Sequence, residues 1–443
     1  MTLMTPLSLL VLLAPGCSDK GEPPEPGPVC GDAVLEGDEL CEQVSSADCD
    51  ALAETWESGL ATCRDDCSGF DVSECVPVDM GNRFEFVKPA ERDERWEDAR
   101  CADGSSALVG VQLSPSGSDD WVIYMNGGGA CEDEARYCDE MGNQPTTTGY
   151  DDGNLGISPI TGIFNRDPSL NPEFADANYA QMITCGADRW TGSTANLIPN
   201  SASPDEGWYF SGRLHLLAIV QILRQRFGLD VNSPATRVLY AGTSGGALGV
   251  MNTATQMAGM MPELAADGRL KGLADAGWIP NWDHPDYRLL ASELSDIEVY
   301  RNQYYFWHAA LDASCTAAQP AGEEGNCYLS EILYPHLPIE MFIQQNAMDP
   351  QWLGNHDIDP LDGSPQEVRE AWTYTMRRSM EDVDWLFSGS VPYLPGGGIY
   401  HGLASDTDNM GHCPHYPNCE PGTSFIEVLG AFWRGEEPVQ IIF

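Results

Sequence analysis

Ser244 stands in a pattern that is typical of a catalytic serine. The stretch GTSGG at 242–246 matches G-x-S-x-G. On a strand–turn–helix segment this pattern forms a nucleophile elbow, a strained turn that exposes the serine hydroxyl. Residues 237–241 (RVLYA) have the composition of a buried strand, and the chain from 247 onward that of a helix. A plain glycine-rich turn is the alternative, and the position between strand and helix favours the elbow.

A second glycine-rich stretch follows the strand-like segment 121–125 (WVIYM). Its residues Gly127, Gly128 and Gly129 leave backbone N–H groups uncovered at the end of a strand. Such groups stabilise the oxyanion that forms during acyl transfer. We therefore expect an oxyanion hole made by the amides of Gly127 and Gly128, with the amide of Gly245 as a third donor. A turn is again the alternative, but acyl transfer needs both a nucleophile and oxyanion donors, so the two signals reinforce each other.

The elements that must position these groups alternate along the chain. Strand-like runs lie at 121–125, 179–184 and 237–241, and apolar residues recur at helical spacing over 216–227, before Gly228. This alternation predicts an α/β fold with a mostly parallel sheet and helices on both faces.

The composition limits the partners. The chain has 443 residues, 42% of them hydrophobic, and a net charge of −46. Such a surface repels nucleic acid and anionic membranes. Solubility outside the cell is the simplest explanation of the charge.

The N-terminus resembles an export signal. Residues 1–16 are too short and too interrupted by proline to span a membrane as a helix. We interpret 1–17 as a signal peptide or lipoprotein signal in which Cys17 is lipidated. An ordinary secretory signal is the alternative, because Pro15 replaces the usual small residue and the first residues carry no Lys or Arg. Residues 18–29 have the composition of a flexible linker.

Cysteine usage supports export. Of 15 cysteines, six lie within 30–75, a segment too short for a strong hydrophobic core. We expect three disulfides in this Cys-rich module, because the spacings lack the paired C-x-x-C that zinc would need. The module resembles short Cys-rich repeats of secreted bacterial proteins, which are usually spacers or display units. A linker at 76–83 and a hydrolase domain at 84–443 complete the expected organisation.

Seven segments between about 84 and 406 together resemble the pectin acetylesterase/Notum family. The resemblance implies an α/β-hydrolase fold and hydrolysis of carboxylic esters without metal or cofactor. The matching segments, in chain order, are CADGSSALVGVQL (101–113), WVIYMNGGGACEDEARYC (121–138), NPEFADANY (171–179), CGADRWTG (185–192), FSGR (210–213), GTSGGALG (242–249) and LADAGW (273–278).

The resemblance also implies a triad in the order serine, acid, histidine. Ser244 matches the nucleophile. The segment 339–353 (IEMFIQQNAMDPQWL) resembles the family segment that ends in the catalytic aspartate, which is Asp349 here. Asp275 also matches a family position, but we interpret it as a structural residue that supports the site.

His401, in GGGIYHGLASD, occupies the place of the family histidine. The cysteine that usually precedes that histidine is absent here, so His412 and His415 remain alternatives for the base. The other histidines lie in helix-like or lid-like stretches, and we interpret them as packing or surface residues; they are His215, His284, His308, His336 and His356.

Two further sets of residues surround this core. Sequence proximity suggests three loop disulfides, and elimination leaves a fourth pair; they are Cys315–Cys327, Cys131–Cys138, Cys413–Cys419 and Cys101–Cys185. Aromatic residues gather within 278–307, where they form either a sugar platform or acyl pocket, or simple packing; they are Trp278, Trp282, Tyr304, Tyr305, Phe306 and Trp307.

The sequence thus predicts an exported serine esterase that removes O-acetyl groups from a polysaccharide, with no metal and no nucleic-acid partner. We expect a monomer, secreted or held at the cell envelope through Cys17. A fatty-acyl esterase of the Notum type and a catalytically weak surface-display or binding protein are the alternatives. Because the net charge is −46, we expect neutral polymers to be better substrates than polyanions at low salt.

Overall fold

The structure is a computed structural model of the chain. It describes residues 30–31, 39–42, 45–81, 83–131, 146–148, 154–157, 161–199, 207–281, 297–356, 358, 365–388, 401–404, 421–438 and 440–442. The predicted signal and linker (1–29) lie outside these ranges.

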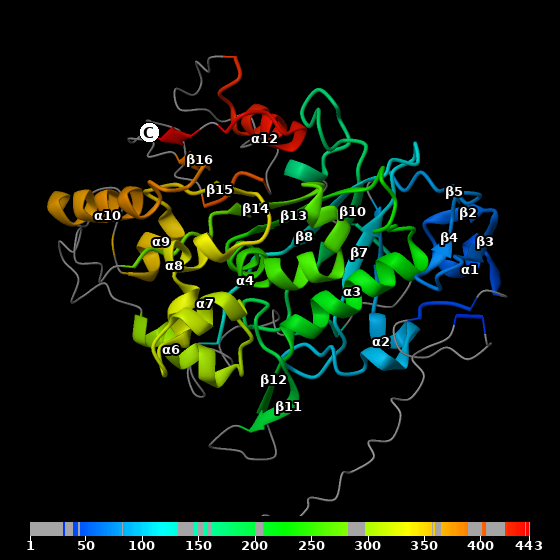
Figure 1. Ribbon diagram of the computed structural model, residues 1–443, viewed down its shortest axis with the longest axis horizontal. Coiled ribbons are helices and arrows are strands. Elements are labelled where there is room, and N and C mark those ends of the chain that lie inside the picture. Colours follow the sequence, from blue (N-terminus) through cyan, green and yellow to red (C-terminus); the bar gives the residue numbers. More distant parts are fainter. Residues whose placement is uncertain are drawn as a thin grey trace, which may run out of the picture.

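A ten-stranded mixed sheet forms the centre of the molecule (Figure 1). Its strand order is β17-β16-β15-β14-β13-β8-β10-β7-β6-β9. The strands from β17 to β10 pair in parallel, and β7, β6 and β9 continue the sheet in antiparallel fashion. The strand bounds are β6 Arg83–Val87, β7 Val109–Gln112, β8 Asp120–Met125, β9 Asn154–Ile157, β10 Asn178–Met182, β13 Arg237–Thr243, β14 Leu270–Asp275, β15 Met341–Gln344, β16 Trp385–Ser388 and β17 Ile441–Ile442.

The parallel register brings the ends of three strands side by side. Thr243, the last residue of β13, pairs with Asp275, the last residue of β14, and Asp275 pairs in turn with Gln344 at the end of β15. The carboxyl ends of parallel strands meet at one edge of a sheet, which is where open α/β folds place their ligands. The turn after β13 therefore lies at this edge.

Helices cover both faces of the sheet, as the sequence predicts. Along β13, Val238 and Tyr240 pack into the hydrophobic core that holds α3 (Gly212–Arg226) and α4 (Gly245–Met260). The alternate residues Leu239 and Ala241 pack into a second core on the opposite face. That core includes the buried face of α12 (Phe425–Arg434), which begins with a capping box at Ser424.

The remaining elements surround this frame. The region between β14 and β15 holds α6 and α7, which lie together below the sheet in Figure 1. The bounds are α2 Pro89–Arg92, η1 Glu94–Trp96, η2 Gly162–Phe164, β11 Thr194–Pro199, β12 Gly207–Phe210, α5 Pro262–Ala266, α6 Ile297–Phe306, α7 Ala313–Ala318, η4 Glu324–Tyr328, α8 Ser330–Leu333, η5 Tyr334–His336, α9 Pro350–Asn355 and α10 Gln366–Ser379.

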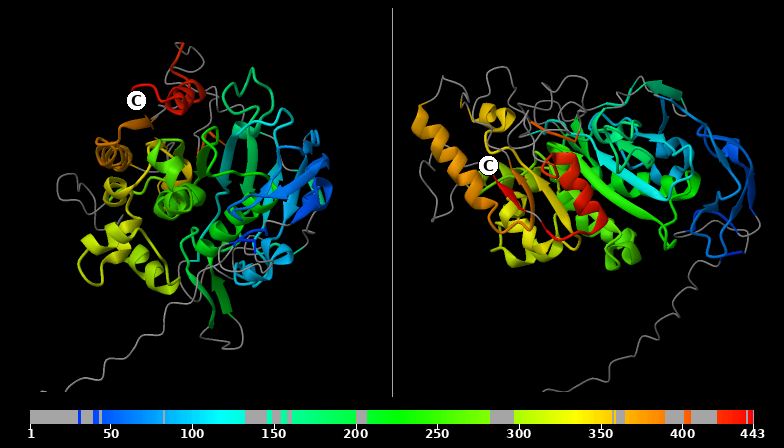
Figure 2. Two further views of the ribbon diagram at one scale, coloured as in Figure 1. Left: turned by 45° about the vertical axis from the view of Figure 1, so that its right-hand side comes forward. Right: turned by 90° about the horizontal axis from the view of Figure 1, so that it is seen from above.

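The Cys-rich module lies at the end of the sheet opposite α10 (Figures 1 and 2). It holds α1 (Cys49–Leu52) and two small sheets, β1-β3-β4 and β2-β5. Three disulfides cross-link it: Cys30–Cys67, Cys41–Cys63 and Cys49–Cys75. Its strands are β1 Ser46–Asp48, β2 Trp56–Ser58, β3 Leu60–Cys63, β4 Phe70–Asp71 and β5 Val76–Pro77.

The module is packed against the hydrolase domain. Trp56 donates from Nε1 to the carbonyl of Arg226 at 2.9 Å, and the Arg226 guanidinium donates to the carbonyl of Leu52 at 2.7 Å. Leu52 and Trp56 belong to the same buried core as the main sheet. In sequence the module resembles spacer and display units, and the structure adds that the module shares a hydrophobic core with α3. The reason is that its few apolar residues face the end of α3 and are buried there.

Two of the four other predicted disulfides are present, Cys101–Cys185 and Cys315–Cys327. Cys131 is also disulfide-bonded, while Cys138, Cys413 and Cys419 lie outside the described residues.

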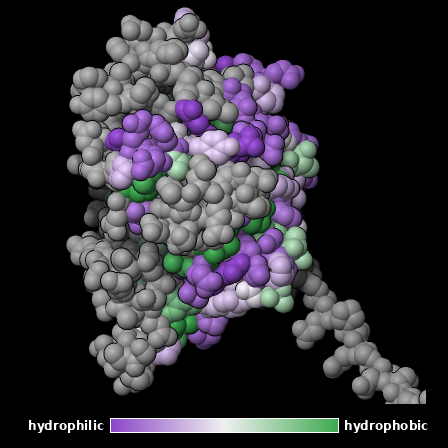
Figure 3. Space-filling model, turned by 90° about the vertical axis from the view of Figure 1, so that its left-hand side faces the viewer, coloured by the Kyte–Doolittle hydropathy of each residue, from purple (hydrophilic) through white to green (hydrophobic). Residues whose placement is uncertain are grey.

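In the described part of the chain, no helix combines the length and hydropathy that a bilayer crossing requires. On the face drawn in Figure 3, hydrophilic residues cover most of the coloured surface, and hydrophobic residues form small strips between them.

Candidate active site

Ser244 lies on a strained turn between β13 and α4. Its backbone angles are φ 58° and ψ −124°, a conformation that non-glycine residues rarely adopt. The turn depends on glycine at 242 and 246, because an added Cβ would lie 2.6 Å from the Gly246 carbonyl carbon and 2.1 Å from the Met125 carbonyl oxygen, respectively. The structure therefore has the elbow geometry that the sequence predicts at this position.

The glycine-rich loop after β8 lies directly against this turn. A Cβ at Gly127 would lie 3.1 Å from Cβ of Ser244, and a Cβ at Gly245 would lie 2.5 Å from the carbonyl oxygen of Gly128. Within the described part of the chain, no acceptor takes the N–H groups of Gly127, Gly128 or Gly245. The three predicted oxyanion donors are thus next to Ser244 and uncommitted.

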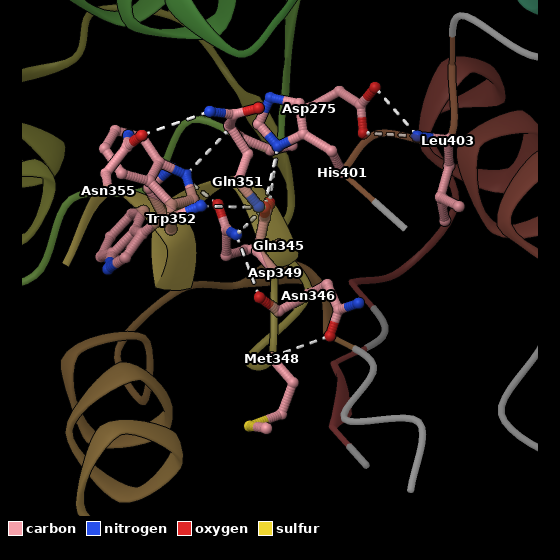
Figure 4. A network of polar contacts seen from close by, with 12 residues as sticks. Asp275, Gln345, Asn346, Met348, Asp349, Gln351, Trp352, Asn355, His401 and Leu403 are labelled. Carbon is pink, nitrogen blue, oxygen red and sulfur yellow. Dashed lines mark hydrogen bonds and ion pairs between the residues drawn. The ribbon is translucent and has the colours of Figure 1, made fainter. Parts of the chain in front are cut away.

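His401 and Asp349 are in direct contact (Figure 4). Nδ1 of His401 lies 2.9 Å from Oδ1 and 3.0 Å from Oδ2 of Asp349. Asp349 is fully buried and is the N-cap of α9, where its Oδ1 accepts the backbone N–H groups of Gln351 and Trp352 at 2.9 and 3.3 Å. Gln345 donates from Nε2 to Oδ2 at 3.2 Å. Asp349 is therefore held firmly in the orientation that contacts the imidazole.

The surroundings of His401 favour its charged form. Burial alone would lower the pKa of this histidine, but the hydrogen bond and negative charge of Asp349, with a smaller contribution from Asp275, raise it above its ordinary value. A histidine in this setting accepts a proton more readily than a free imidazole does, which suits a general base.

Asp275 connects the two halves of the site. Its carboxylate accepts the hydroxyl of Thr243 at 2.6 Å and the backbone N–H groups of Leu403 and Ala404 at about 3 Å. Its backbone carbonyl accepts the N–H of Ser244 at 2.8 Å. Burial raises the pKa of Asp275 to about 6. The carboxylate thus supports the residues beside Ser244 and His401 and is fully occupied by these donors.

Ser244 and His401 line one cavity of about 1040 Å³. Its polar side chains outnumber its apolar ones, and none of its described lining residues is an Asp or Glu. The side chains that the sequence analysis did not anticipate here include Tyr124, Thr161, Phe164, Gln181, Gln351, Trp352 and Asn355. Gln351, Trp352 and Asn355 could have been found from the sequence, because they lie on α9, within two helical turns of the predicted Asp349. The other side chains come from segments far apart in the chain.

Other residues singled out in the sequence lie elsewhere. Trp278 and Trp307 are buried in the core and donate their indole N–H groups to Ser379 and the Cys131 carbonyl. Within the described residues, no member of the aromatic stretch 278–307 lines the cavity. The packing interpretation holds for Trp278 and Trp307, whereas Tyr305 is exposed on the surface. Trp282, His412 and His415 lie outside the described residues.

The fold and the site together define an α/β-hydrolase with a serine elbow. A family model described as Pectinacetylesterase matches residues 83–376, and the chain belongs to this family.

Relatives and a solved structure agree with this assignment. The chain is 28% identical over 307 residues to palmitoleoyl-protein carboxylesterase notum1 of Xenopus laevis, covering 65% of this chain and 58% of that protein. It is 28% identical over 303 residues to palmitoleoyl-protein carboxylesterase NOTUM of Homo sapiens, covering 65% and 57%. The match therefore spans less than two thirds of these relatives. The structure of the Wnt deacylase Notum from Drosophila matches with a TM-score of 0.65 at 21% identity, covering 81% of this chain and 96% of that one, and shows the shared fold.

Proposed function

We propose that the protein is an exported serine carboxylic-ester hydrolase that removes O-acetyl groups from a polysaccharide. The observation that carries this proposal is the contact of His401 with the buried Asp349 beside a cavity that Ser244 also lines. A serine, a histidine and an orienting carboxylate at one cavity are the groups that acyl transfer needs.

In the proposed reaction, His401 takes the hydroxyl proton of Ser244 as Oγ attacks the ester carbonyl. Asp349 fixes the imidazole tautomer and stabilises the imidazolium. The amides of Gly127, Gly128 and Gly245 bind the tetrahedral oxyanion, where each donor contributes about 2.7–4 kcal/mol to lowering the barrier. His401 then protonates the leaving alcohol, and the same groups activate water to release the acid from the acyl-enzyme.

The character of the cavity supports a polar substrate. Its volume of about 1040 Å³ is far larger than an acetyl group requires, so the cavity has room for the alcohol part of the ester. The amide side chains of Asn126, Gln181 and Asn355 line it, together with the hydroxyl side chain of Thr161. These groups match sugar hydroxyls better than a hydrocarbon chain.

Fatty-acyl hydrolysis is the second candidate, because the Xenopus and human relatives are named palmitoleoyl-protein carboxylesterases. The same cavity volume would hold a long acyl chain. A display or binding protein with weak turnover is the third candidate function.

Export is supported by the disulfides, which do not persist in a reducing cytosol. Attachment through Cys17 and a monomeric state belong to the proposal as well.

A series of 4-nitrophenyl esters from acetate to palmitate tests the proposal, together with acetate release from a neutral acetylated polysaccharide. We expect kcat/KM to be highest for acetate and acetate to be released from the polymer. Higher activity on palmitate would favour the fatty-acyl candidate. Absence of hydrolysis across the series, with a folded protein, would favour the display protein.

A further inference from the structure

The cavity that Ser244 lines also contains an arginine that the proposed reaction does not use. Arg189 lies among the lining residues. It belongs to the stretch CGADRWTG, in which Ala187, Arg189 and Trp190 all have positive φ, at 52°, 50° and 65°. Strained backbone of this kind persists only where the surrounding structure enforces it, and it gathers at functional sites.

Asp188 enforces this conformation. It is buried, and its Oδ1 accepts the N–H of Trp190 at 3.0 Å while its Oδ2 accepts the N–H of Gly212 at 2.8 Å. These bonds tie the turn to the start of α3. The position of Arg189 at the cavity is therefore fixed by the backbone on both sides of it.

Aromatic rings support the guanidinium of Arg189. Its Cζ lies 5.2 Å from the ring centroid of Tyr300 and 5.8 Å from that of Trp307. A guanidinium over a ring face is stabilised as a cation, but its N–H donors point within its own plane and are not satisfied by the ring. The rings therefore hold the charge in place and leave the donors for another group.

Those donors have no acceptor in the described part of the chain. Nη1 of Arg189 is buried and makes no hydrogen bond, and no described carboxylate lies within ion-pair distance of the side chain. By contrast, Arg213 near the start of α3 donates to the carbonyl of Ala310 at 2.8 Å. A buried donor without a partner is costly, and a ligand oxygen would satisfy it.

We infer that Arg189 forms an anion subsite for a carboxylate carried by the ester substrate. A carboxylate fits the planar fork of an arginine with two parallel hydrogen bonds. This inference rests on the proposed function and adds a charge requirement to it. It does not conflict with the net charge of −46, because that charge repels a long polyanion during its approach, whereas Arg189 acts on one carboxylate at contact distance.

The test compares esters that differ only in one charge. On the alcohol side the pair is 4-acetoxybenzoate and 4-acetoxybenzamide, and on the acyl side it is the mono-4-nitrophenyl ester of glutarate and its terminal carboxamide. We expect Arg189→Gln to lower kcat/KM for the carboxylate about tenfold or more relative to the carboxamide in at least one pair, mainly through KM. Arg189→Lys should recover part of the preference.

Arg237→Gln is the matched control, since it removes the same charge at the start of β13, the opposite end of that strand from Ser244. It should leave the ratio of carboxylate to carboxamide unchanged. The melting temperature and circular dichroism spectrum of Arg189→Gln check that this variant folds. Equal effects of Arg189→Gln on both members of both pairs would overturn the anion subsite.

A binding measurement keeps the inference separate from the proposed reaction. Ser244→Ala protein, which cannot form an acyl-enzyme, is titrated calorimetrically with 4-acetoxybenzoate and 4-acetoxybenzamide, with and without Arg189→Gln. Tighter binding of the carboxylate that disappears in the double variant supports the subsite even if no ester is hydrolysed. Equal affinities in both proteins for both compounds, together with equal effects of Arg189→Gln on the two glutarate esters, would contradict it.

Discussion

The backbone carbonyl of Asp275 accepts the N–H of Ser244 at 2.8 Å. The carboxylate of the same residue accepts the backbone N–H groups of Leu403 and Ala404, two and three residues after His401. Figure 4 shows the carboxylate of Asp275 hydrogen-bonded to Leu403 beside His401. One buried residue at the end of β14 thus fixes the turn of the proposed nucleophile and the loop of the proposed base. The two aspartates therefore have different contacts: Asp275 supports the backbone, and Asp349 contacts the imidazole of His401.

Asparagine substitutions at the two aspartates should therefore have different effects. Asp349→Asn removes the charge that orients and stabilises the imidazolium, and we expect kcat to fall about 10,000-fold with little change in melting temperature. Asp275→Asn turns an amide N–H toward other donors, so we expect a loss of about 1–3 kcal/mol in unfolding free energy and a smaller loss of kcat. Esterase assays and thermal melts of both variants measure this. A silent Asp275→Asn melt combined with lost turnover would reverse the two roles.

A substitution at Gly245 tests whether the glycine-rich loop after β8 must lie against Ser244. In Gly245→Ala, the new Cβ would lie 2.5 Å from the carbonyl oxygen of Gly128, so the loop must move away from Ser244. Loss of aligned donors should lower kcat about 100-fold or more.

The control for this variant lies on the same helix. No atom lies within 4 Å of a Cβ added at Gly259, so Gly259→Ala should keep full activity and raise the unfolding free energy by about 0.5–1 kcal/mol. Full activity of Gly245→Ala would mean that the described position of the Gly128 loop does not matter for turnover.

Much of this arrangement follows from local sequence. The elbow at 242–246, the strand before it and the strand at 121–125 were predictable because glycine pattern and apolar runs are local signals. Observed β8 and β13 extend the predicted strands by one and two residues, and α4 begins at Gly245 rather than at 247. Helix ends depend on backbone geometry that hydrophobic periodicity does not report.

The contact between His401 and Asp349 and the role of Asp275 depended on the family resemblance. No local pattern connects these residues: Asp275 ends β14, Asp349 follows β15 and His401 follows β16, and they meet where these neighbouring strands end. The cavity wall was missed for the same reason: Phe164 and Gln181 reach it from separate elements. The sequence of the Cys-rich module does not reveal how the module packs, because Trp56 is buried against α3, which lies in the hydrolase domain.

The buried carboxyl group of Glu85 should make the free energy of unfolding depend on pH. It is fully buried on β6, accepts the N–H of Thr55 in the Cys-rich module at 2.9 Å, and has its pKa raised by burial from 4.5 to about 7. The folded state therefore binds this proton more tightly than the unfolded state does. The resulting stability is fully present below pH 4.5 and is lost as the pH rises to 7, by about 3 kcal/mol at most.

Glu85→Gln cannot titrate and should remove this contribution. We expect the unfolding free energy of the wild type, minus that of the variant, to decrease between pH 4.5 and 7 in chemical denaturation. A difference that is constant over this range would show that Glu85 titrates normally.

The ionic strength should change the ratio of kcat/KM between neutral and anionic polysaccharides. With a net charge of −46, we expect a higher kcat/KM for a neutral acetylated polysaccharide than for acetylated polygalacturonate at low ionic strength. The difference should narrow with salt, because the Debye length falls from about 30 Å at 0.01 M to about 3 Å at 1 M. A preference for the polygalacturonate that weakens with salt would instead indicate a basic groove extending beyond Arg189.

The central claim is that Ser244 is the nucleophile, and covalent labelling tests it most directly. A fluorophosphonate reacts with a serine only where a base and an oxyanion site activate it. Intact mass and peptide mapping should show one adduct on the wild type, at Ser244, and none on a folded Ser244→Ala variant. Equal labelling of the two proteins, or a single adduct on another residue, would contradict the account.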